Sequence, residues 1–202
     1  MNFQLLLCFI MSTIAPIVGI QHTVLISKCN RQIPQVAKGS RMLLIGDSLA
    51  QGMSPHFNKS ARSRGYLPFV KCLQGSRIDY WSPRLEAIIN DIRPTLVVVS
   101  LGTNDAGMTV PESQRQHIKN IKKIIDRYGA KIIWLLPQPL PSRFVGQNDI
   151  KKIINEELQN NVYDAKIKLE KAEDKIHLTS KGYETWMNAT WEHMASKGII
   201  VN

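Results

Sequence analysis

The chain is poor in the residues that mark several classes of protein. It has only three cysteines among 202 residues, with no Cys-x-x-Cys pair and no Cys/His cluster, which argues against a metal-bound or disulfide-rich protein. Its 12 glycines and 10 prolines are too few for a collagen-like or low-complexity chain. Because 44% of the residues are apolar, the composition predicts one ordinary folded domain with a real core.

Acidic residues are also scarce, since 16 Asp and Glu stand against 26 Lys and Arg for a formal net charge of +10. The basic residues are scattered in ones and twos without an aromatic-spaced stripe, so we expect no nucleic-acid partner. Such a charge attracts a cell-wall polymer, an acidic glycan or an anionic membrane surface. The same net charge equally suits a solvated surface that keeps the protein soluble. We expect the protein to be a monomer.

Charge is absent from residues 3–20. This apolar run ends in Pro16 and Gly19, as in the hydrophobic and cleavage regions of a secretory signal. We therefore expect residues 1–20 to be a signal peptide and the protein to be secreted, periplasmic or otherwise extracytoplasmic. The alternatives are an uncleaved N-terminal anchor, which would attach the protein to a membrane, and a buried core helix.

Cleavage of that segment would leave Cys29 and Cys72 as the only thiols of the mature chain. An even pair in an exported protein can form a disulfide, and two unrelated, half-buried thiols are the alternative. Cys29 lies in residues 21–40, which we interpret as an N-terminal extension. The folded domain is expected over residues 41–202.

The domain alternates strand and helix patterns. Continuous apolar runs, typical of strands buried on both faces of a parallel sheet, cover residues 42–45, 95–101 and 131–136. Residues 66–71 are a weaker strand in which Pro68 favours an edge position, and residues 161–166 are a weaker fifth strand.

Between these strands, apolar residues recur at spacings of three and four, which predicts helices. The helical patterns cover about residues 48–62, 85–92, 118–128, 150–158 and 179–198. Thr109 and Glu112 have the spacing of a capping box before the third of them. Strands separated by helices of this length require right-handed crossovers, so the predicted fold is a three-layer α/β/α sandwich. Functional residues in such sheets gather beyond the carboxyl ends of the strands.

The first motif at such a position is Gly46-Asp47-Ser48, which follows the first strand and opens a helix. Ser48 is thereby placed at the carboxyl edge of the sheet, beside helix N–H groups that favour negative charge. This position suits a nucleophile, and the alternative is that Ser48 only caps the helix. Asp47 either orders the turn or contributes to the electrostatic field of the site.

The second motif is Gly102-Thr103-Asn104-Asp105, which follows the strongest strand, and Gly75 follows the edge strand. Asn104 can offer a side-chain N–H, and Gly75 can offer its backbone N–H without a side chain in the way. Together with the backbone N–H of Ser48, these donors would form an oxyanion hole. An ordinary turn and a flexible glycine are the alternatives.

The third motif places Asp174 three residues before His177, ahead of the last helix. A carboxylate there can accept the Nδ1 proton of the ring, which leaves Nε2 free to take a proton from Ser48. Serine needs such a base because its hydroxyl alone is a weak nucleophile. The alternative is a surface turn with an incidental histidine.

Each motif is common by composition, but the three in this order are rare. Over about residues 41–197 the chain resembles the SGNH hydrolases, also called GDSL esterases. The resemblance is carried by Gly-Asp-Ser-Leu at 46–49, Gly75, Gly-Thr-Asn-Asp at 102–105 and Asp174-x-x-His177. It implies a flavodoxin-like sandwich of five parallel strands and ester hydrolysis through an acyl-serine, without metal or organic cofactor. It also implies catalysis by Ser48, Asp174 and His177, with Ser48, Gly75 and Asn104 as the oxyanion hole.

The substrate is less defined. The short connection from Pro141 to Glu173 leaves little room for a lid, and a small basic exported domain resembles family members that remove acetyl groups from peptidoglycan or other polysaccharides. Lipases, lysophospholipases and thioesterases of the family use the same residues, and a catalytically silent polysaccharide-binding module would keep the same fold. Asp47, Arg77 and Trp81 are candidates for substrate binding, although Trp81 would equally pack at a helix start.

Overall fold

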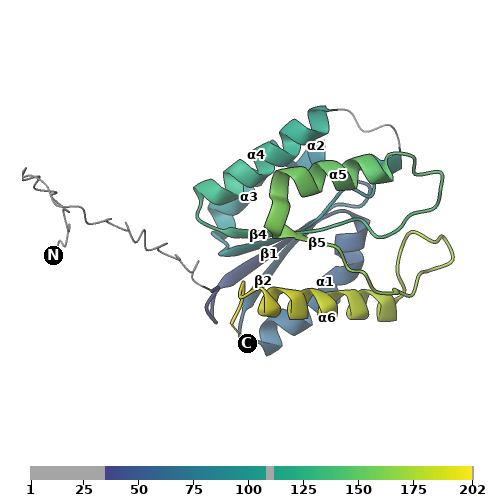
Figure 1. Ribbon diagram of the computed structural model, residues 1–202. Helices are drawn as coiled ribbons and strands as arrows, with labels where there is room; N and C mark the ends of the chain where they lie inside the picture. Colours follow the sequence, from purple (N-terminus) through teal and green to yellow (C-terminus); the bar gives the residue numbers. More distant parts are fainter. Residues whose placement is uncertain (1–34, 108–111, 202) are drawn as a thin grey trace, which may run out of the picture. The chain divides into compact units, whose positions relative to one another are not determined.

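Five parallel strands form one sheet in the order β2-β1-β3-β4-β5 (Figure 1). The computed structural model describes residues 35–107 and 112–201. The strands are β1 (Arg41–Gly46), β2 (Leu67–Cys72), β3 (Leu96–Ser100), β4 (Lys131–Leu135) and β5 (Val162–Tyr163). This order is that of the flavodoxin-like sheet, so the predicted fold and the edge position of the strand with Pro68 are confirmed.

Helices cover both faces of the sheet, which gives the three predicted layers (Figure 1). One face is covered by α1 (Ser48–Ser63) and α6 (Ser180–Ser196). The other is covered by α2 (Ile78–Trp81), α3 (Leu85–Ile92), α4 (Ser113–Arg127) and α5 (Gln147–Leu158). Short 3-10 turns at Asp105–Gly107 and Gln159–Asn161 flank α5.

The central strands are apolar throughout because both faces of the sheet are buried. In β1, Met42 and Leu44 pack toward α1 and α6, whereas Leu43 and Ile45 pack toward the opposite layer. All four side chains are fully buried. Alternation of side chains across a strand thus supplies two separate cores from one continuous run of aliphatic residues.

Two elements differ from the sequence-based prediction. β5 is only two residues long, where residues 161–166 were expected, because Asp164 and Lys166 are exposed and beyond Tyr163 nothing pairs with β4. The capping box is also wrong: α4 begins at Ser113, so Glu112 precedes the helix and its carboxylate bonds to Arg115 instead of capping. Thr109 lies outside the described residues.

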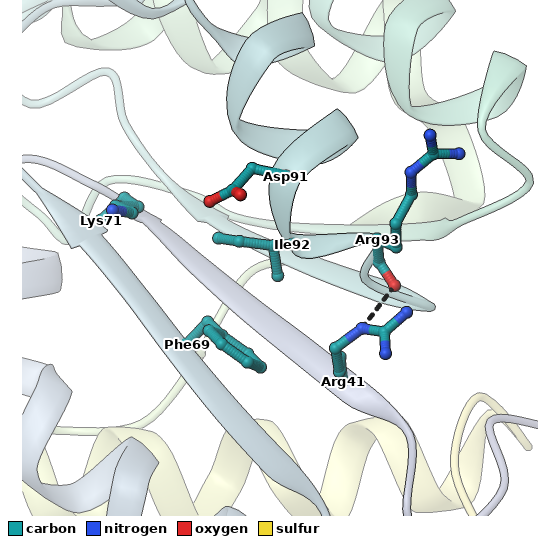
Figure 2. Close-up of a pocket in the computed structure, with 6 residues that line it drawn as sticks. All are labelled: Arg41, Phe69, Lys71, Asp91, Ile92 and Arg93. Atoms are coloured by element: carbon teal, nitrogen blue, oxygen red, sulfur yellow. Dashed lines mark hydrogen bonds between the residues drawn. The ribbon is translucent and has the colours of Figure 1, made fainter.

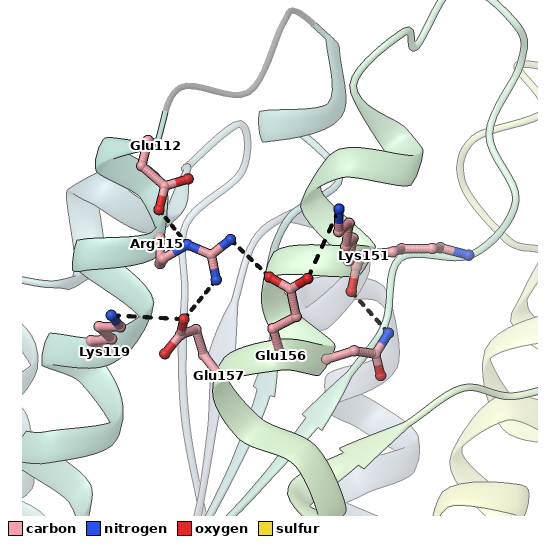
Figure 3. A network of polar contacts seen from close by, with 8 residues as sticks. Glu112, Arg115, Lys119, Lys151, Glu156 and Glu157 are labelled. Carbon is pink, nitrogen blue, oxygen red and sulfur yellow. Dashed lines mark hydrogen bonds and ion pairs between the residues drawn. The ribbon is translucent and has the colours of Figure 1, made fainter.

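A polar network joins α4 to α5 (Figure 3). Arg115 donates to Glu157 at 2.7 Å and to Glu156 at 2.8 Å, and Lys119 lies 3.8 Å from Glu157. Hydrogen bonds to the Glu157 and Glu156 carboxylates raise the pKa of Arg115. Since α5 also packs on the 3-10 turn at Asp105–Gly107, the network braces the helices beside the loop that follows β3.

Val36 pairs with Ile200, and its N–H donates to the carbonyl oxygen of Ile199, so the described fold begins before Arg41. The expected signal or anchor over residues 1–20 and Cys29 lie outside the described residues, and the Cys29–Cys72 disulfide stays a prediction. Cys72 ends β2, where burial raises the pKa of its thiol to about 12. Within residues 35–107 and 112–201, no helix is both long and apolar enough to cross a bilayer.

Candidate active site

The candidate residues come together at the carboxyl ends of neighbouring strands. Gly46, the last residue of β1, is in register with Cys72 of β2 and with Ser100 of β3. Asp47 and Ser48, the turn with Gly75, and the loop with Asn104 therefore leave the sheet at the same edge. Gly46 must be glycine, because a Cβ at this position would collide with the carbonyl oxygen of Ser100.

Asp47, and not Ser48, caps α1. Asp47 has extended backbone angles, and its Oδ1 accepts the N–H of Leu49 at 2.9 Å. Ser48 is the first residue of the helix, so its hydroxyl is not used for capping. It lies instead 2.9 Å from Nε2 of His177. The capping interpretation of Ser48 is therefore wrong.

Ser48, His177 and Asp174 form one continuous chain of hydrogen bonds. His177 Nδ1 lies 2.5 Å from Asp174 Oδ2, while the other oxygen of Asp174 accepts the backbone N–H groups of Ile176 and His177, each at 2.9 Å. The bond from His177 is the main cause that lowers the pKa of Asp174 to about 2, and the Ile176 N–H adds to it. An ionised carboxylate holding Nδ1–H leaves Nε2 as a proton acceptor facing the Ser48 hydroxyl.

A hairpin carries Asp174 and His177. Lys171 pairs with Leu178 in an antiparallel bridge, and Lys175 at the turn has a left-handed backbone with φ of +60°. The ammonium group of Lys171 bonds to the carbonyl oxygen of Lys175 at 3.1 Å and to that of Pro139 beyond β4. These contacts tie the hairpin to the sheet edge, although Asp174 itself is 45% exposed.

The two expected oxyanion donors lie on adjoining loops. Gly75 is exposed, with φ of +73°, in a turn closed by the N–H of Ser76 donating to Leu73 at 3.1 Å. Asn104 Nδ2 donates to the carbonyl oxygen of Ser76 at 3.0 Å and to Asp47 Oδ2 at 3.3 Å. The amide nitrogen carries two protons, and both are already used in these bonds. An oxyanion that binds to Asn104 would therefore have to take or share the proton of the longer bond, the one to Asp47.

Two buried carboxyl groups lie beneath these loops. Burial raises the pKa of Asp47 to about 7 and that of Asp105 to about 6. Asp105 Oδ2 accepts the N–H of Ile78 at 3.4 Å, and its Oδ1 lies 3.6 Å from Arg77 Nε. Through these two contacts, Asp105 links the loop after β3 to the start of α2. Arg77 also pairs with Asp79 at 3.5 Å.

The raised pKa of Asp47 predicts how stability depends on pH. Between about pH 4 and pH 7 the folded protein keeps a proton that the unfolded chain releases, so the free energy of unfolding falls as pH rises through this window. Asp47→Asn removes this titration and keeps a good capping residue. Denaturant unfolding at about pH 4.5 and about pH 7.5 should show a smaller fall for the variant than for the wild type. Equal falls would contradict the raised pKa.

The three candidate substrate-binding residues differ in whether substrate can reach them. Asp47 is fully buried and capping, and Trp81 is only 4% exposed within the core, where its Nε1 donates to Ser76 Oγ at 2.9 Å. Neither offers a surface to substrate, so that interpretation is wrong for both. Arg77 is 30% exposed next to the Gly75 turn and stays a candidate. Sequence reasoning passed over Ser76, because a serine after a turn glycine carries no distinctive signal.

An open groove of about 550 Å³ lies apart from these residues (Figure 2). It is lined by Arg41, Phe69, Lys71, Asp91, Ile92 and Arg93. Arg41 Nε donates to the carbonyl oxygen of Arg93 across it at 3.1 Å. Among the described residues, no group of three or more His, Cys, Asp or Glu side chains is arranged to hold a metal ion.

The fold and the triad geometry define a serine hydrolase of the α/β/α class, and the family is established by sequence. The profile of the GDSL-like lipase/acylhydrolase family matches residues 44–185. The chain therefore belongs to this family and is an SGNH-type ester hydrolase, which confirms the resemblance drawn from the motifs. No curated protein sequence matches the chain.

Solved structures share the fold at low sequence identity. TesA is 20% identical with a TM-score of 0.61, covering 77% of this chain and 98% of its own. The acetyl xylan esterase AlAXEase is 15% identical with a TM-score of 0.64, covering 76% of this chain and 98% of its own. A catalytic mutant of Axe2, an acetylxylan esterase from Geobacillus stearothermophilus, is 11% identical with a TM-score of 0.64, covering 83% and 100%.

Proposed function

We propose that the protein is an exported esterase that removes short acyl groups, O-acetyl groups in particular, from a polysaccharide. The observation that supports catalysis most strongly is the unbroken chain of hydrogen bonds from Asp174 through His177 to Ser48. A silent binding module has no need for this geometry, because a carbohydrate can be held without a nucleophile facing a base.

In the proposed reaction, Ser48 Oγ attacks the ester carbonyl carbon while its proton passes to His177 Nε2. The tetrahedral intermediate collapses, and His177 delivers that proton to the oxygen of the leaving alcohol. Water then attacks the acyl-serine while His177 takes a proton from it. Collapse of this second tetrahedral intermediate releases the carboxylic acid, and His177 returns the proton to Ser48 Oγ. Asp174 stays ionised throughout and stabilises the imidazolium that forms twice in each cycle.

The negative charge that develops on the carbonyl oxygen needs donors already in place. The backbone N–H groups of Ser48 and Gly75 and the side-chain amide of Asn104 are proposed to supply them. The Ser48 N–H lies at the start of α1, where the helix dipole favours negative charge. The bond from Asn104 to the carbonyl oxygen of Ser76 keeps two of the three donor loops together.

Two observations support an acetyl ester as the substrate, and a third supports an acidic polymer as the carrier of that ester. Between β4 and α6 the described residues form the helix α5, which packs on the sheet, a 3-10 turn, the short edge strand β5 and loops, and they contain no inserted substrate domain. Two of the structures with the same fold are named as acetylxylan esterases. The net charge of +10 would draw an acidic polymer to the enzyme.

Acyl-chain length tests the substrate class. If the acyl site is short and open, each added methylene stays in water and forgoes the roughly 0.8 kcal/mol that burial would supply. Values of kcat/KM for p-nitrophenyl esters should therefore stay flat or fall from two carbons to about eight. A steady rise along the series would favour a lipase or thioesterase over an O-acetylesterase.

A further inference from the structure

We propose that Ser76 is a positioning residue that holds the two halves of the oxyanion hole in register, an inference that rests on the proposed roles of Gly75 and Asn104. Ser76 touches no reacting atom. Its hydroxyl shapes the turn that presents the Gly75 N–H, and its carbonyl oxygen orients the Asn104 amide. One side chain and one peptide group thus connect donors that lie on different loops.

The hydroxyl of Ser76 is held from both sides. It donates to the carbonyl oxygen of Leu73 at 2.7 Å, and it accepts the indole N–H of Trp81 at 2.9 Å. Ser76 is only 6% exposed, so these bonds have little competition from water. Since Leu73 and Ser76 bracket the turn with Gly75, the hydroxyl closes the turn from inside and restricts the orientation of its peptide groups.

The same turn is attached to the end of β1. The N–H of Leu73 donates to the carbonyl oxygen of Gly46 at 2.9 Å, and the Ser76 hydroxyl lies 3.5 Å from that oxygen. Gly46 is two residues before the proposed nucleophile Ser48. The bond between Leu73 and Gly46 therefore fixes the Gly75 turn close to Ser48, and with it the distance from the Gly75 N–H to Ser48 Oγ.

The carbonyl oxygen of Ser76 determines which way the Asn104 amide faces. It accepts from Asn104 Nδ2 at 3.0 Å, the shorter of the two bonds that this nitrogen makes. An amide is planar, so fixing one N–H fixes the direction of the other. Moving the Ser76 peptide would rotate the proton that the oxyanion needs, and a misplacement of about 1 Å in a catalytic group can cost about 10²-fold in rate.

Ser76→Ala is the direct test. It leaves the buried indole N–H of Trp81 without its partner. It also removes the hydroxyl bond to Leu73, whose carbonyl oxygen keeps only the backbone N–H of residue 76, and it should loosen the turn. We expect kcat for p-nitrophenyl acetate to fall about 10- to 100-fold, with kcat/KM falling equally and KM changing less than about threefold. This pattern marks an interaction made only in the transition state. An effect on KM alone, or a kcat within about twofold of the wild type, would overturn the inference.

Ser82 offers a matched control. Ser82 is only 3% exposed, and its hydroxyl accepts the side-chain amide of Asn120 at 2.9 Å in the layer of α2 and α4. Ser82→Ala should lower the melting temperature about as much as Ser76→Ala but leave kcat within about twofold. Equal losses of kcat in both variants would assign the effect to general destabilisation and contradict the positioning role.

A variant of the partner covers the case in which Ser76→Ala does not fold. Trp81→Phe removes the indole N–H that bonds to Ser76 and keeps most of the ring packing. It should lower kcat in the same direction as Ser76→Ala but by a smaller factor, again with little change in KM. A wild-type kcat in folded Trp81→Phe, together with an inactive or insoluble Ser76→Ala, would count against the inference.

Combining Ser76→Ala with Asn104→Ala separates the two levels of the proposal. If Ser76 acts through the Asn104 amide, the loss in the double variant should be smaller than the product of the two single losses. A loss equal to that product would show that Ser76 does not act through Asn104, which overturns the proposal that it holds both halves of the hole in register. If Asn104→Ala alone leaves kcat unchanged, the proposed role of Asn104 in the oxyanion hole is rejected. If Asn104→Ala lowers kcat strongly and Ser76→Ala leaves kcat unchanged, only the role of Ser76 is rejected.

Discussion

Ser48→Ala should lower kcat by about four orders of magnitude or more while the protein stays folded. The loss is expected to be this large because no other hydroxyl is placed 2.9 Å from His177 Nε2 among the described contacts. The fold should be unaffected, since Asp47 supplies the cap of α1 and alanine suits the first turn of a helix. Hydrolysis of p-nitrophenyl acetate and circular dichroism measure the two properties.

Ser54 provides the control on the same helix. Its hydroxyl donates to the carbonyl oxygen of Gln51 at 2.8 Å and takes no part in the triad. Ser54→Ala should keep wild-type activity. A serine-reactive phosphonate should label the wild type and Ser54→Ala once, at Ser48, and should not label Ser48→Ala. Activity of Ser48→Ala within tenfold of the wild type would reject Ser48 as the nucleophile.

Asn104→Ala should cost about 10²- to 10³-fold in kcat, which is roughly 2.7 to 4 kcal/mol, with little change in KM. The reason is that the amide is proposed to bind the oxyanion, whose charge develops only in the transition state. The variant also removes the bonds to Ser76 and Asp47. A change confined to KM would instead make Asn104 a substrate-binding residue.

Asn120 matches Asn104 closely enough to serve as its control. Its Nδ2 donates to the carbonyl oxygen of Ser82 at 3.2 Å and to the Ser82 hydroxyl at 2.9 Å, in a similarly half-buried position. Asn120→Ala therefore removes two amide bonds, as Asn104→Ala does, and one bond in each pair goes to a serine carbonyl oxygen. Its kcat should stay near that of the wild type, so a parallel loss in both variants would reject the oxyanion role.

Much of the fold could be predicted because both faces of the central strands are buried. Between their terminal residues, β1, β3 and β4 have no polar position that would suit a wet face. Each connection between β1, β2, β3 and β4 contains a helix of 8 to 16 residues, as a crossover between parallel strands requires. The triad could be predicted for a similar reason. Parallel strands bring their carboxyl ends to one edge, so residues far apart in sequence meet there.

The parts that could not be predicted depend on contacts between loops. Asp47 and Ser48 are both good capping residues, and the sequence alone does not say which of them caps α1. The backbone decides it, because Asp47 is extended and Ser48 is already the first residue of the helix. The burial of Trp81 and the bonds of Ser76 depend on how α2 packs beneath the Gly75 turn. Only Val162 and Tyr163 of β5 pair with β4. Two residues are too few for an apolar pattern, so the end of this strand could not be predicted from the sequence.

The exposed hairpin that carries Asp174 and His177 is held to the sheet by fewer buried contacts than the loops that carry Gly75 and Asn104. The proposed oxyanion loops are fastened to the two central strands β1 and β3 through buried groups, whereas the hairpin is attached through Lys171, one bridge and the start of α6. Segments with few buried contacts open at lower free energy than the core. Local opening of the hairpin would therefore separate His177 from Ser48 while the loops with Gly75 and Asn104 keep their places. On heating, we expect esterase activity to be lost at a lower temperature than the fold itself.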